Sequence, residues 1–152
     1  MAITVVKIGG NVIDDDQALD SFINDFARLS APKVLVHGGG KLATAMSRRL
    51  GIETHMIEGR RITDRDTLNI VTMVYGGLVN KNIVAKLQRE GCNAIGLSGA
   101  DANIIPAERR PAQPIDYGYV GDIDTSRVNV QALASLLGAS DGDSALNMNE
   151  PH

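Results

Sequence analysis

Two apolar runs of this sequence each end in adjacent glycines, an arrangement typical of turns that bind anions. The glycines are Gly9 and Gly10 after the first run, and Gly38, Gly39 and Gly40 after the second. Glycine allows the backbone to approach a ligand closely and to point its N–H groups at a negative charge. A helix that begins just beyond each turn adds positive potential. Two such turns at one edge of a parallel sheet would hold two anionic groups side by side, as a group transfer between them requires.

Lys7 stands near the end of the first run, where a long charged side chain is unusual without a partner. Ligands of α/β sheets bind beyond the carboxyl ends of the strands, so Lys7 is placed to reach a phosphate and to neutralise charge on a transferring phosphoryl group. The alternative is a strand-end lysine whose ammonium extends into solvent. The strand alone gives the two interpretations equal weight, and the adjacent Gly9 and Gly10 favour the phosphate-binding one.

The triple glycine Gly38–Gly40 is the stronger signal, because three consecutive glycines lose much conformational entropy on folding. We interpret it as a backbone cradle for a carboxylate or phosphate; the alternative is a sharp turn from strand to helix. His37, directly before it, is interpreted as a hydrogen-bonded structural residue rather than a catalyst. The guanidinium fork of Arg61 suits a carboxylate, and the alternative for Arg60 and Arg61 is an exposed basic hairpin.

Other site chemistries find little support in the sequence. Neither glycine cluster is a Walker A loop or a G-x-G-x-x-G fingerprint. The acidic residues form no close pair of the kind that glycosidases use. The histidines His37, His55 and His152 have no metal-ligand spacing with Cys92, so we expect no metal held by the protein itself.

Composition restricts the class of protein. The 152 residues suffice for one domain with a real core, and 43% of them are hydrophobic, as in globular proteins. A net charge of −3 gives no electrostatic case for nucleic acid or an acidic membrane as a partner. The single cysteine excludes an internal disulfide, and neither a signal peptide nor a membrane-spanning run is visible. We therefore expect a cytoplasmic protein that binds neither nucleic acid nor membrane.

Strand and helix patterns alternate along the chain and predict the elements that position these residues. Strands are expected at 3–8, 33–37 and 94–97, a hairpin at 53–63 with its turn at Glu58-Gly59, and strands or hairpin arms at 103–107 and 117–123. Helices are expected after a cap at 14–16 with Leu19, Phe22, Ile23, Phe26 and Leu29 inward, at 43–50, from about 64 to 90 with an interruption at Gly76-Gly77, and at 129–137. This order predicts an α/β fold with an open, mainly parallel sheet and helices on both faces.

Taken in order, five short motifs resemble the amino-acid kinase family, and within it the N-acetylglutamate kinases. They are Lys7–Gly10 (KIGG), Val36–Gly40 (VHGGG), Gly59–Thr63 (GRRIT), Val79–Lys81 (VNK) and Gly96–Asp101 (GLSGAD). Residues 73–82 and 117–122 are similar to the Bacteroidetes-type branch, some of whose members prefer N-succinyl-glutamate. Each motif is weak alone, whereas the ordered set, which spans about residues 1–137, is specific. The resemblance implies the carbamate-kinase-like first lobe of this family.

The resemblance also implies an activity. ATP, with Mg²⁺ carried by the nucleotide, would phosphorylate the γ-carboxylate of N-acetyl- or N-succinyl-L-glutamate in arginine biosynthesis. By correspondence with the family motifs, Lys7 would stabilise the transferring phosphoryl group, and Gly9 and Gly10 would hold the ATP phosphates. The turn Gly38–Gly40 would bind the amino-acid substrate, and Arg61 would bind one of its carboxylates.

The family has two lobes, and the resemblance assigns residues 1–138 to the first, which holds the acyl-glutamate half of the site. Residues 139–152 are expected to form an irregular tail, in which Asn147 corresponds to a substrate-binding asparagine, while Glu150 and Pro151 depart from the family pattern. We find no counterpart of the second, adenine-binding lobe.

Two alternatives to this activity are open. A truncated, catalytically silent module would bind a ligand or dimerise through the long helix, because the family's first lobe carries its homodimer surface. A sister kinase acting on carbamate, aspartate, glutamate or UMP is disfavoured by the motif Gly59–Thr63.

Overall fold

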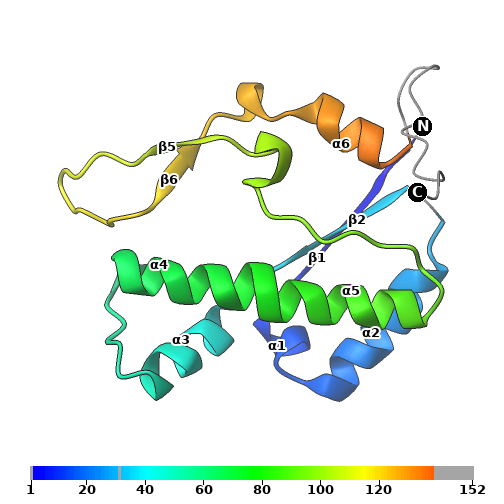
Figure 1. Ribbon diagram of the computed structural model, residues 1–152, viewed down its shortest axis with the longest axis horizontal. Helices are drawn as coiled ribbons and strands as arrows, with labels where there is room; N and C mark the ends of the chain where they lie inside the picture. Colours follow the sequence, from blue (N-terminus) through cyan, green and yellow to red (C-terminus); the bar gives the residue numbers. More distant parts are fainter. Residues whose placement is uncertain (1, 31, 139–152) are drawn as a thin grey trace, which may run out of the picture.

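A parallel pair of strands lies at the centre of the computed structural model, which describes residues 2–30 and 32–138 (Figure 1). β1 (Thr4–Ile8) pairs with β2 (Lys33–His37) in a register that sets Ile8 opposite His37, so both strands end at the same edge. Both strands confirm the sequence prediction. Ile8 is buried, whereas Val5 is 64% exposed and Lys7 is exposed on the same open face.

Helices begin within both glycine turns. α1 (Gly10–Ile13) is a single turn that begins at the first glycine turn, where a helix start was expected, and α2 (Asp16–Arg28) follows it with the predicted aspartate cap, the carboxylate of Asp15. α3 (Gly40–Arg49) begins three residues before the expected Ala43. Glycine has low helix propensity, so the sequence pattern placed the helix start too late.

The long helix predicted beyond Asp64 is continuous but changes its pitch. α4 (Arg65–Val71) leads into a π-helical segment (Thr72–Val79) and then into α5 (Asn80–Arg89), with Gly91 at φ +72° beyond the end. The expected interruption at Gly76-Gly77 therefore takes the form of wide π turns. A Cβ at either glycine would meet nothing within 4 Å, so no other described helix crosses closely there.

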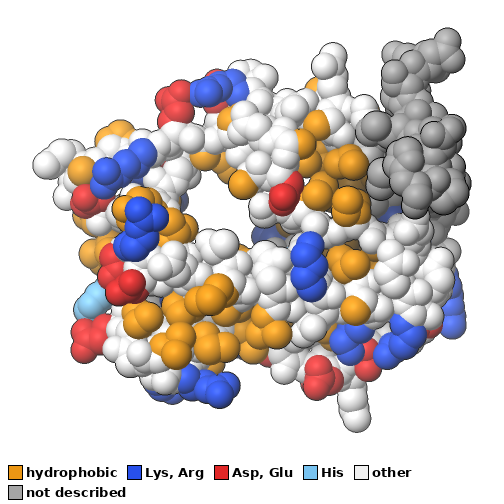
Figure 2. All heavy atoms as spheres, in the orientation of Figure 1, with side chains coloured by type: hydrophobic (Ala, Val, Ile, Leu, Met, Phe, Trp, Pro, Cys, Tyr) orange, Lys and Arg blue, Asp and Glu red, His pale blue; other side chains and the backbone are white. Residues whose placement is uncertain are grey.

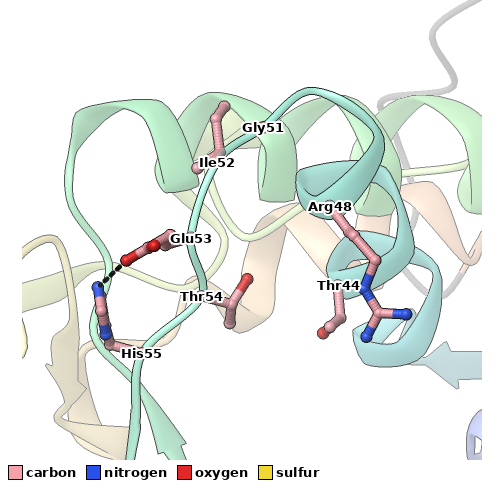
Figure 3. Close-up of a pocket in the computed structure, with 7 residues that line it drawn as sticks. All are labelled: Thr44, Arg48, Gly51, Ile52, Glu53, Thr54 and His55. Carbon is pink, nitrogen blue, oxygen red and sulfur yellow. Dashed lines mark ion pairs between the residues drawn. The ribbon is translucent and has the colours of Figure 1, made fainter.

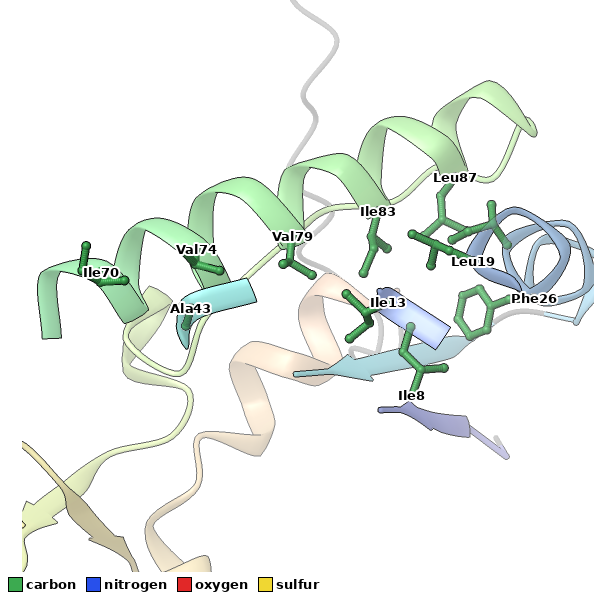
Figure 4. Close-up of a cluster of buried hydrophobic side chains, with 11 residues drawn as sticks. Ile8, Ile13, Leu19, Phe26, Ala43, Ile70, Val74, Val79, Ile83 and Leu87 are labelled. Atoms are coloured by element: carbon green, nitrogen blue, oxygen red, sulfur yellow. The ribbon is translucent and has the colours of Figure 1, made fainter. Parts of the chain in front are cut away.

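The π segment keeps one apolar face of the long helix in the core. Its buried residues are Ile70, Val74, Val79, Ile83 and Leu87 (Figure 4). The spacing is four residues except between Val74 and Val79, where it is five, which matches the i to i+5 repeat of a π turn. An unbroken α-helix would rotate this face away from its partners.

Those partners are the buried face of α2 and the residues around the two strand ends. They are Ile8, Ile13, Leu19, Ile23, Phe26 and Ala43 (Figure 4). Phe22 is half-buried against the same cluster, as expected. Leu29, expected on the inner face, is exposed because α2 ends at Arg28.

The strand expected at 94–97 is absent, and this prediction is wrong. Ile95 is 66% exposed, and no described strand pairs with this extended segment. Side chains of α5 hold it instead: Lys81 Nζ donates to Gly96 O at 2.9 Å and Gln88 Nε2 donates to Ala94 O at 3.0 Å. The apolar run thus has its carbonyls satisfied without a sheet.

Two antiparallel hairpins complete the fold. β3 (Met56–Ile57) and β4 (Arg60–Arg61) meet at the predicted turn, where Glu58 and Gly59 have φ values of +50° and +76°. β5 (Ala107–Arg109) pairs with β6 (Gly121–Ile123); the expected strand 103–107 begins only at Ala107 because residues 101–103 form a 3₁₀ turn. A second 3₁₀ turn (Thr125–Arg127) precedes α6 (Val130–Leu136), which confirms the helix expected at 129–137 and is capped by the side chain of Asn129.

These elements confirm the α/β class with parallel strands and helices. Figure 1 shows β1 and β2 between α6 on one side and the layer of α1, α2 and α5 on the other. Within the described ranges, no helix has the length and apolarity needed to cross a membrane. The predicted tail, including Asn147, lies outside the described residues.

The core of α2 offers a first test. Replacing Ile23, which is 0% exposed, with Ala should lower the free energy of unfolding by about 2–5 kcal/mol, because the cavity adds to the lost burial. The matched control Ile95→Ala, at a position 66% exposed, should change it by less than about 0.5 kcal/mol. Urea unfolding followed by circular dichroism measures both. Equal losses would contradict the described packing.

Candidate active site

The two glycine turns lie side by side at one edge of the parallel pair. Because Ile8 is in register with His37, Gly9 and Gly38 leave the sheet together. Gly9 is the N-cap residue of α1 and Gly39 the N-cap residue of α3. The structure therefore brings the two predicted anion-binding turns together as expected.

The glycines of these turns differ in the space that surrounds them. A Cβ on Gly39 would lie 3.0 Å from Cδ1 of Tyr75 and 3.4 Å from Cγ2 of Val79, so Gly39 lets the π segment pack against the turn. A Cβ on Gly9 or Gly38 would meet nothing within 4 Å, and neither residue has a positive φ. Nothing in the described chain demands glycine at these two positions, which is the result expected where a ligand approaches the backbone.

Lys7 lies on the open face of β1, opposite Val36 in the register. Within residues 2–30 and 32–138 its ammonium has neither a hydrogen bond nor an ion pair. A second lysine, Lys41 in the first turn of α3, does have partners: its Nζ is 3.4 Å from Asp14 Oδ2 and 3.3 Å from Asn11 Oδ1. Lys41 thereby ties the helix after the second glycine turn to the helix after the first.

Arg61 on β4 reaches the second glycine turn. Its Nη2 donates to Thr44 Oγ1 at 2.9 Å and to Gly40 O at 3.3 Å, and its Nη1 donates to Thr54 Oγ1 at 3.4 Å. The structure thus brings Arg61 to Gly40, as the sequence predicts. These partners are neutral oxygens, and the described residues supply no carboxylate to the guanidinium, so its charge remains available to an anion.

Two adjoining hollows open beside Arg61. One, of about 520 Å³, is lined by Gly40, Lys41, Thr44, Ala45, Arg48, Met56 and Arg61. The other, of about 420 Å³, shares Thr44 and Arg48 and is completed by Gly51, Ile52, Glu53, Thr54 and His55 (Figure 3). The first contains three cationic side chains and no acidic one, which favours an anionic ligand there.

His37 holds the second glycine turn. Its Nδ1 lies 2.9 Å from Gly38 O and its Nε2 lies 3.2 Å from Asn80 Nδ2. The Asn80 amide N–H also donates to Leu97 O at 3.4 Å, so Nε2 is the acceptor and Nδ1 carries the proton that is donated to Gly38 O. The structure confirms that His37 is hydrogen-bonded at this turn, as expected. That it is not a catalyst stays a prediction.

Two aspartates of the motif-bearing segments serve as cap and turn residues. The backbone N–H of Thr67 lowers the pKa of Asp64, which caps α4 just after the strand that carries Arg61. The backbone N–H of Ser98 likewise lowers the pKa of Asp101. Among the described residues, no three His, Cys, Asp or Glu side chains gather as metal ligands would.

Sequence reasoning missed several residues that support the site. They are Lys41, Thr44, Thr54, Tyr75 and Asn80. Tyr75 and Asn80 lie within the stretch 73–82 that carried the family resemblance, and the five-residue apolar spacing around Tyr75 was the available signal. Thr44 and Thr54 act through long-range contacts that no local pattern reports.

Known proteins that are similar in sequence identify the family of this chain. The model of the amino acid kinase family matches residues 2–144. An acetylglutamate kinase of Cytophaga hutchinsonii is 61% identical over 134 residues, which are 88% of this chain and 50% of that protein. An acetylglutamate kinase of Bacteroides thetaiotaomicron is 54% identical over 89% of this chain and 52% of its own length.

Solved structures share the fold of this chain. The crystal structure of smu.665 from Streptococcus mutans superposes with a TM-score of 0.74 at 27% identity, covering 90% of this chain and 54% of that one. An N-acetylglutamate synthase from Neisseria gonorrhoeae, complexed with coenzyme A and N-acetyl-glutamate, superposes with a TM-score of 0.66 at 25% identity over 31% of its length. This chain spans about half the length of the curated relatives that it matches. It belongs to the amino acid kinase family.

Proposed function

We propose that this chain forms the acyl-glutamate-binding half of an acetylglutamate kinase, which transfers a phosphoryl group from ATP to the γ-carboxylate of N-acetyl- or N-succinyl-L-glutamate in arginine biosynthesis. One observation carries the proposal. Arg61, without a carboxylate partner in the described chain, is hydrogen-bonded to Gly40 of the turn Gly38–Gly40, and the other glycine turn, at Gly9 and Gly10, lies beside it. A dicarboxylate held at Arg61 places its other carboxylate near a turn suited to phosphates.

The residues present divide the work between two anions. The turn Gly38–Gly40 and Arg61 hold the acyl-glutamate, and Gly9, Gly10 and Lys7 serve the nucleotide phosphates. In the transfer, a γ-carboxylate oxygen bonds to phosphorus while the bond from that phosphorus to ADP breaks, and Lys7 neutralises the charge on the moving group. ATP is a substrate and brings Mg²⁺ with it. The open space at Gly9 and the ammonium of Lys7, which is unpaired among the described residues, fit a phosphate.

The relatives support the acceptor, but this chain spans only about half of their length. Those of Cytophaga hutchinsonii and Bacteroides thetaiotaomicron are named acetylglutamate kinases, and about half of each is matched. The whole proteins carry that name. The second candidate function for this chain is therefore binding or dimerisation without catalysis. For either function we propose a cytoplasmic location, which the free thiol of Cys92 favours.

The assigned role of Arg61 is testable by binding. Arg61→Ala should raise the Kd for N-acetyl-L-glutamate about tenfold to a hundredfold, since a hydrogen bond to a charged group is worth about 1.5–3 kcal/mol. Isothermal titration calorimetry with N-acetyl- and N-succinyl-L-glutamate measures it. The matched control is Arg60→Ala on the same hairpin, which is exposed and should leave the Kd unchanged.

Thr44→Val separates positioning from charge in this test. It removes the 2.9 Å hydrogen bond to Arg61 Nη2 but keeps the guanidinium, so its effect should be smaller than that of Arg61→Ala. Equal affinity of the wild-type chain and Arg61→Ala would reject the assignment of Arg61.

Lys7 is tested by turnover. With Mg²⁺ and ATP, trapping of the acyl phosphate by hydroxylamine reports the reaction, and Lys7→Ala should slow it about a hundredfold or more while leaving N-acetyl-L-glutamate binding intact. Val5→Ala, on the same exposed face of β1, should have little effect on either quantity. Wild-type binding without hydroxamate would favour the catalytically silent alternative, and a fully active Lys7→Ala chain would remove Lys7 from the mechanism.

We also propose that two copies of the chain associate through the π segment. Met73 and Leu78 are 55% and 45% exposed there, and the space beside Gly76 and Gly77 is open. Figure 2 shows apolar side chains gathered over this part of the long helix. Exposed apolar patches of this kind mark interaction sites.

Sedimentation velocity tests this association. Met73→Asp should shift the chain toward monomer, because a carboxylate would be desolvated in the interface. Ile95→Asp, at a comparably exposed apolar position outside the helix, should not. A monomeric wild-type chain, or an unchanged dimer in Met73→Asp, would overturn the assignment of this surface.

A further inference from the structure

The Tyr117–Tyr119 segment is hydrogen-bonded to the residue that follows the Arg61 strand. The N–H of Thr63 donates to Tyr117 O at 2.9 Å, and the N–H of Tyr119 donates to Thr63 O at 2.7 Å. The two hydrogen bonds form a parallel bridge between Thr63 and Gly118. Residues more than 50 positions apart are thereby joined beside the site.

This bridge depends on the absence of a side chain at residue 118. Gly118 has a φ of +75°, and a Cβ there would lie 2.2 Å from Thr63 O and 2.9 Å from Thr63 C. Backbone atoms cannot yield as the end of a flexible side chain can, so a larger residue must separate the two segments. The carboxylate of Asp116 also holds the turn, accepting from the Gly118 N–H at 2.8 Å.

Side chains on both segments reinforce the contact. Thr63 is 7% exposed and Tyr117 is 8% exposed, so the bridge is shielded from water. The guanidinium of Arg65, two residues beyond Thr63, lies 5.3 Å from the centre of the Tyr119 ring. The contact is therefore an ordered part of the fold and not a chance approach of two loops.

The backbone at Arg61 is held from both sides, and the contact with residues 117–119 supports one of them. On one side β4 pairs with β3, and the N–H of Ile62 donates to His55 O at 2.9 Å. On the other side the Thr63 hydroxyl donates to Arg61 O at 3.3 Å, and Thr63 is itself fixed by residues 117–119. The β3–β4 hairpin is only two residues long on each strand, and such a short ribbon needs external support to hold a side chain in place.

We propose that residues 117–119 position Arg61, and that Gly118 is a positioning residue of the acyl-glutamate site although it does not touch the ligand. This inference rests on the proposed function for its ligand. The claim that the bridge between Thr63 and Gly118 immobilises the strand of Arg61 does not depend on the ligand.

Gly118→Ala compared with Gly91→Ala provides the affinity test. Both glycines have nearly the same φ, +75° and +72°, but a Cβ on Gly91 would meet nothing within 4 Å. Gly118→Ala should raise the Kd for N-acetyl-L-glutamate roughly tenfold or more, as displacement of a binding group by a fraction of an ångström does. Gly91→Ala should leave the Kd within about twofold, because it costs only backbone strain. Equal Kd values for the two variants would overturn the inference.

A double substitution tests whether the effect passes through Arg61. In an Arg61→Lys background the guanidinium fork is gone, so adding Gly118→Ala should produce little further loss of affinity. Full additivity of the two changes would show that Gly118 acts independently of Arg61. Asp116→Ala, which removes only the acceptor for the Gly118 N–H, is a milder variant that should raise the Kd in the same direction if Gly118→Ala does not fold.

Hydrogen exchange without ligand separates this inference from the proposed function. In Gly118→Ala the Ile62 N–H, which is bonded to His55 and not to residues 117–119, should exchange faster than in Gly91→Ala. If wild-type chain fails to bind N-acetyl-L-glutamate, the proposed function is wrong and the exchange rates alone decide the positioning role. If the ligand binds and Ile62 exchanges equally in both variants, the positioning role is wrong and the proposed function stands.

Discussion

The site depends on the register of one short parallel strand pair. Because Ile8 lies opposite His37, the chain leaves the sheet at Gly9 and Gly38 on the same edge, and both following helices begin there. A shift of one residue would turn the buried side chains of β1 outward and separate the two turns. The register is therefore fixed by the same apolar contacts that build the core, and the site inherits its geometry from them.

The long helix is the second constraint, because it packs directly against one of these turns. Tyr75 fills the space that a Cβ on Gly39 would occupy, and Asn80 donates to His37, whose Nδ1–H donates to Gly38 O. The π turns make both contacts compatible with a continuous core face, since they restore the buried stripe after Val74. The glycine turn is thus held on its inner side by the helix, and its outer side remains open.

Local signals in the sequence were sufficient for the elements that depend on them. The strand 33–37, the Glu58-Gly59 turn and the aspartate cap at Asp15 follow from residue type and near neighbours, and the structure has them as predicted. The failure at 94–97 has the opposite cause: an apolar run became neither strand nor helix because side chains of α5 took its carbonyls. A strand requires a partner, and no pattern within the run reports whether one exists.

The same distinction separates the two halves of the site. The phosphate-suited turn, with Lys7 and Gly9, is built by β1 and α1, so residues close in sequence define it and the sequence could identify it. Arg61 is also visible as a residue type, but its placement requires Thr44 from α3, Thr54 from the preceding loop and the bridge of Thr63 to Gly118. These contacts are nonlocal, and each is only one or two hydrogen bonds. Since a guanidinium that binds a carboxylate must be fixed in orientation as well as position, the proposed acyl-glutamate half of the site depends on a much longer stretch of chain than the proposed phosphate half.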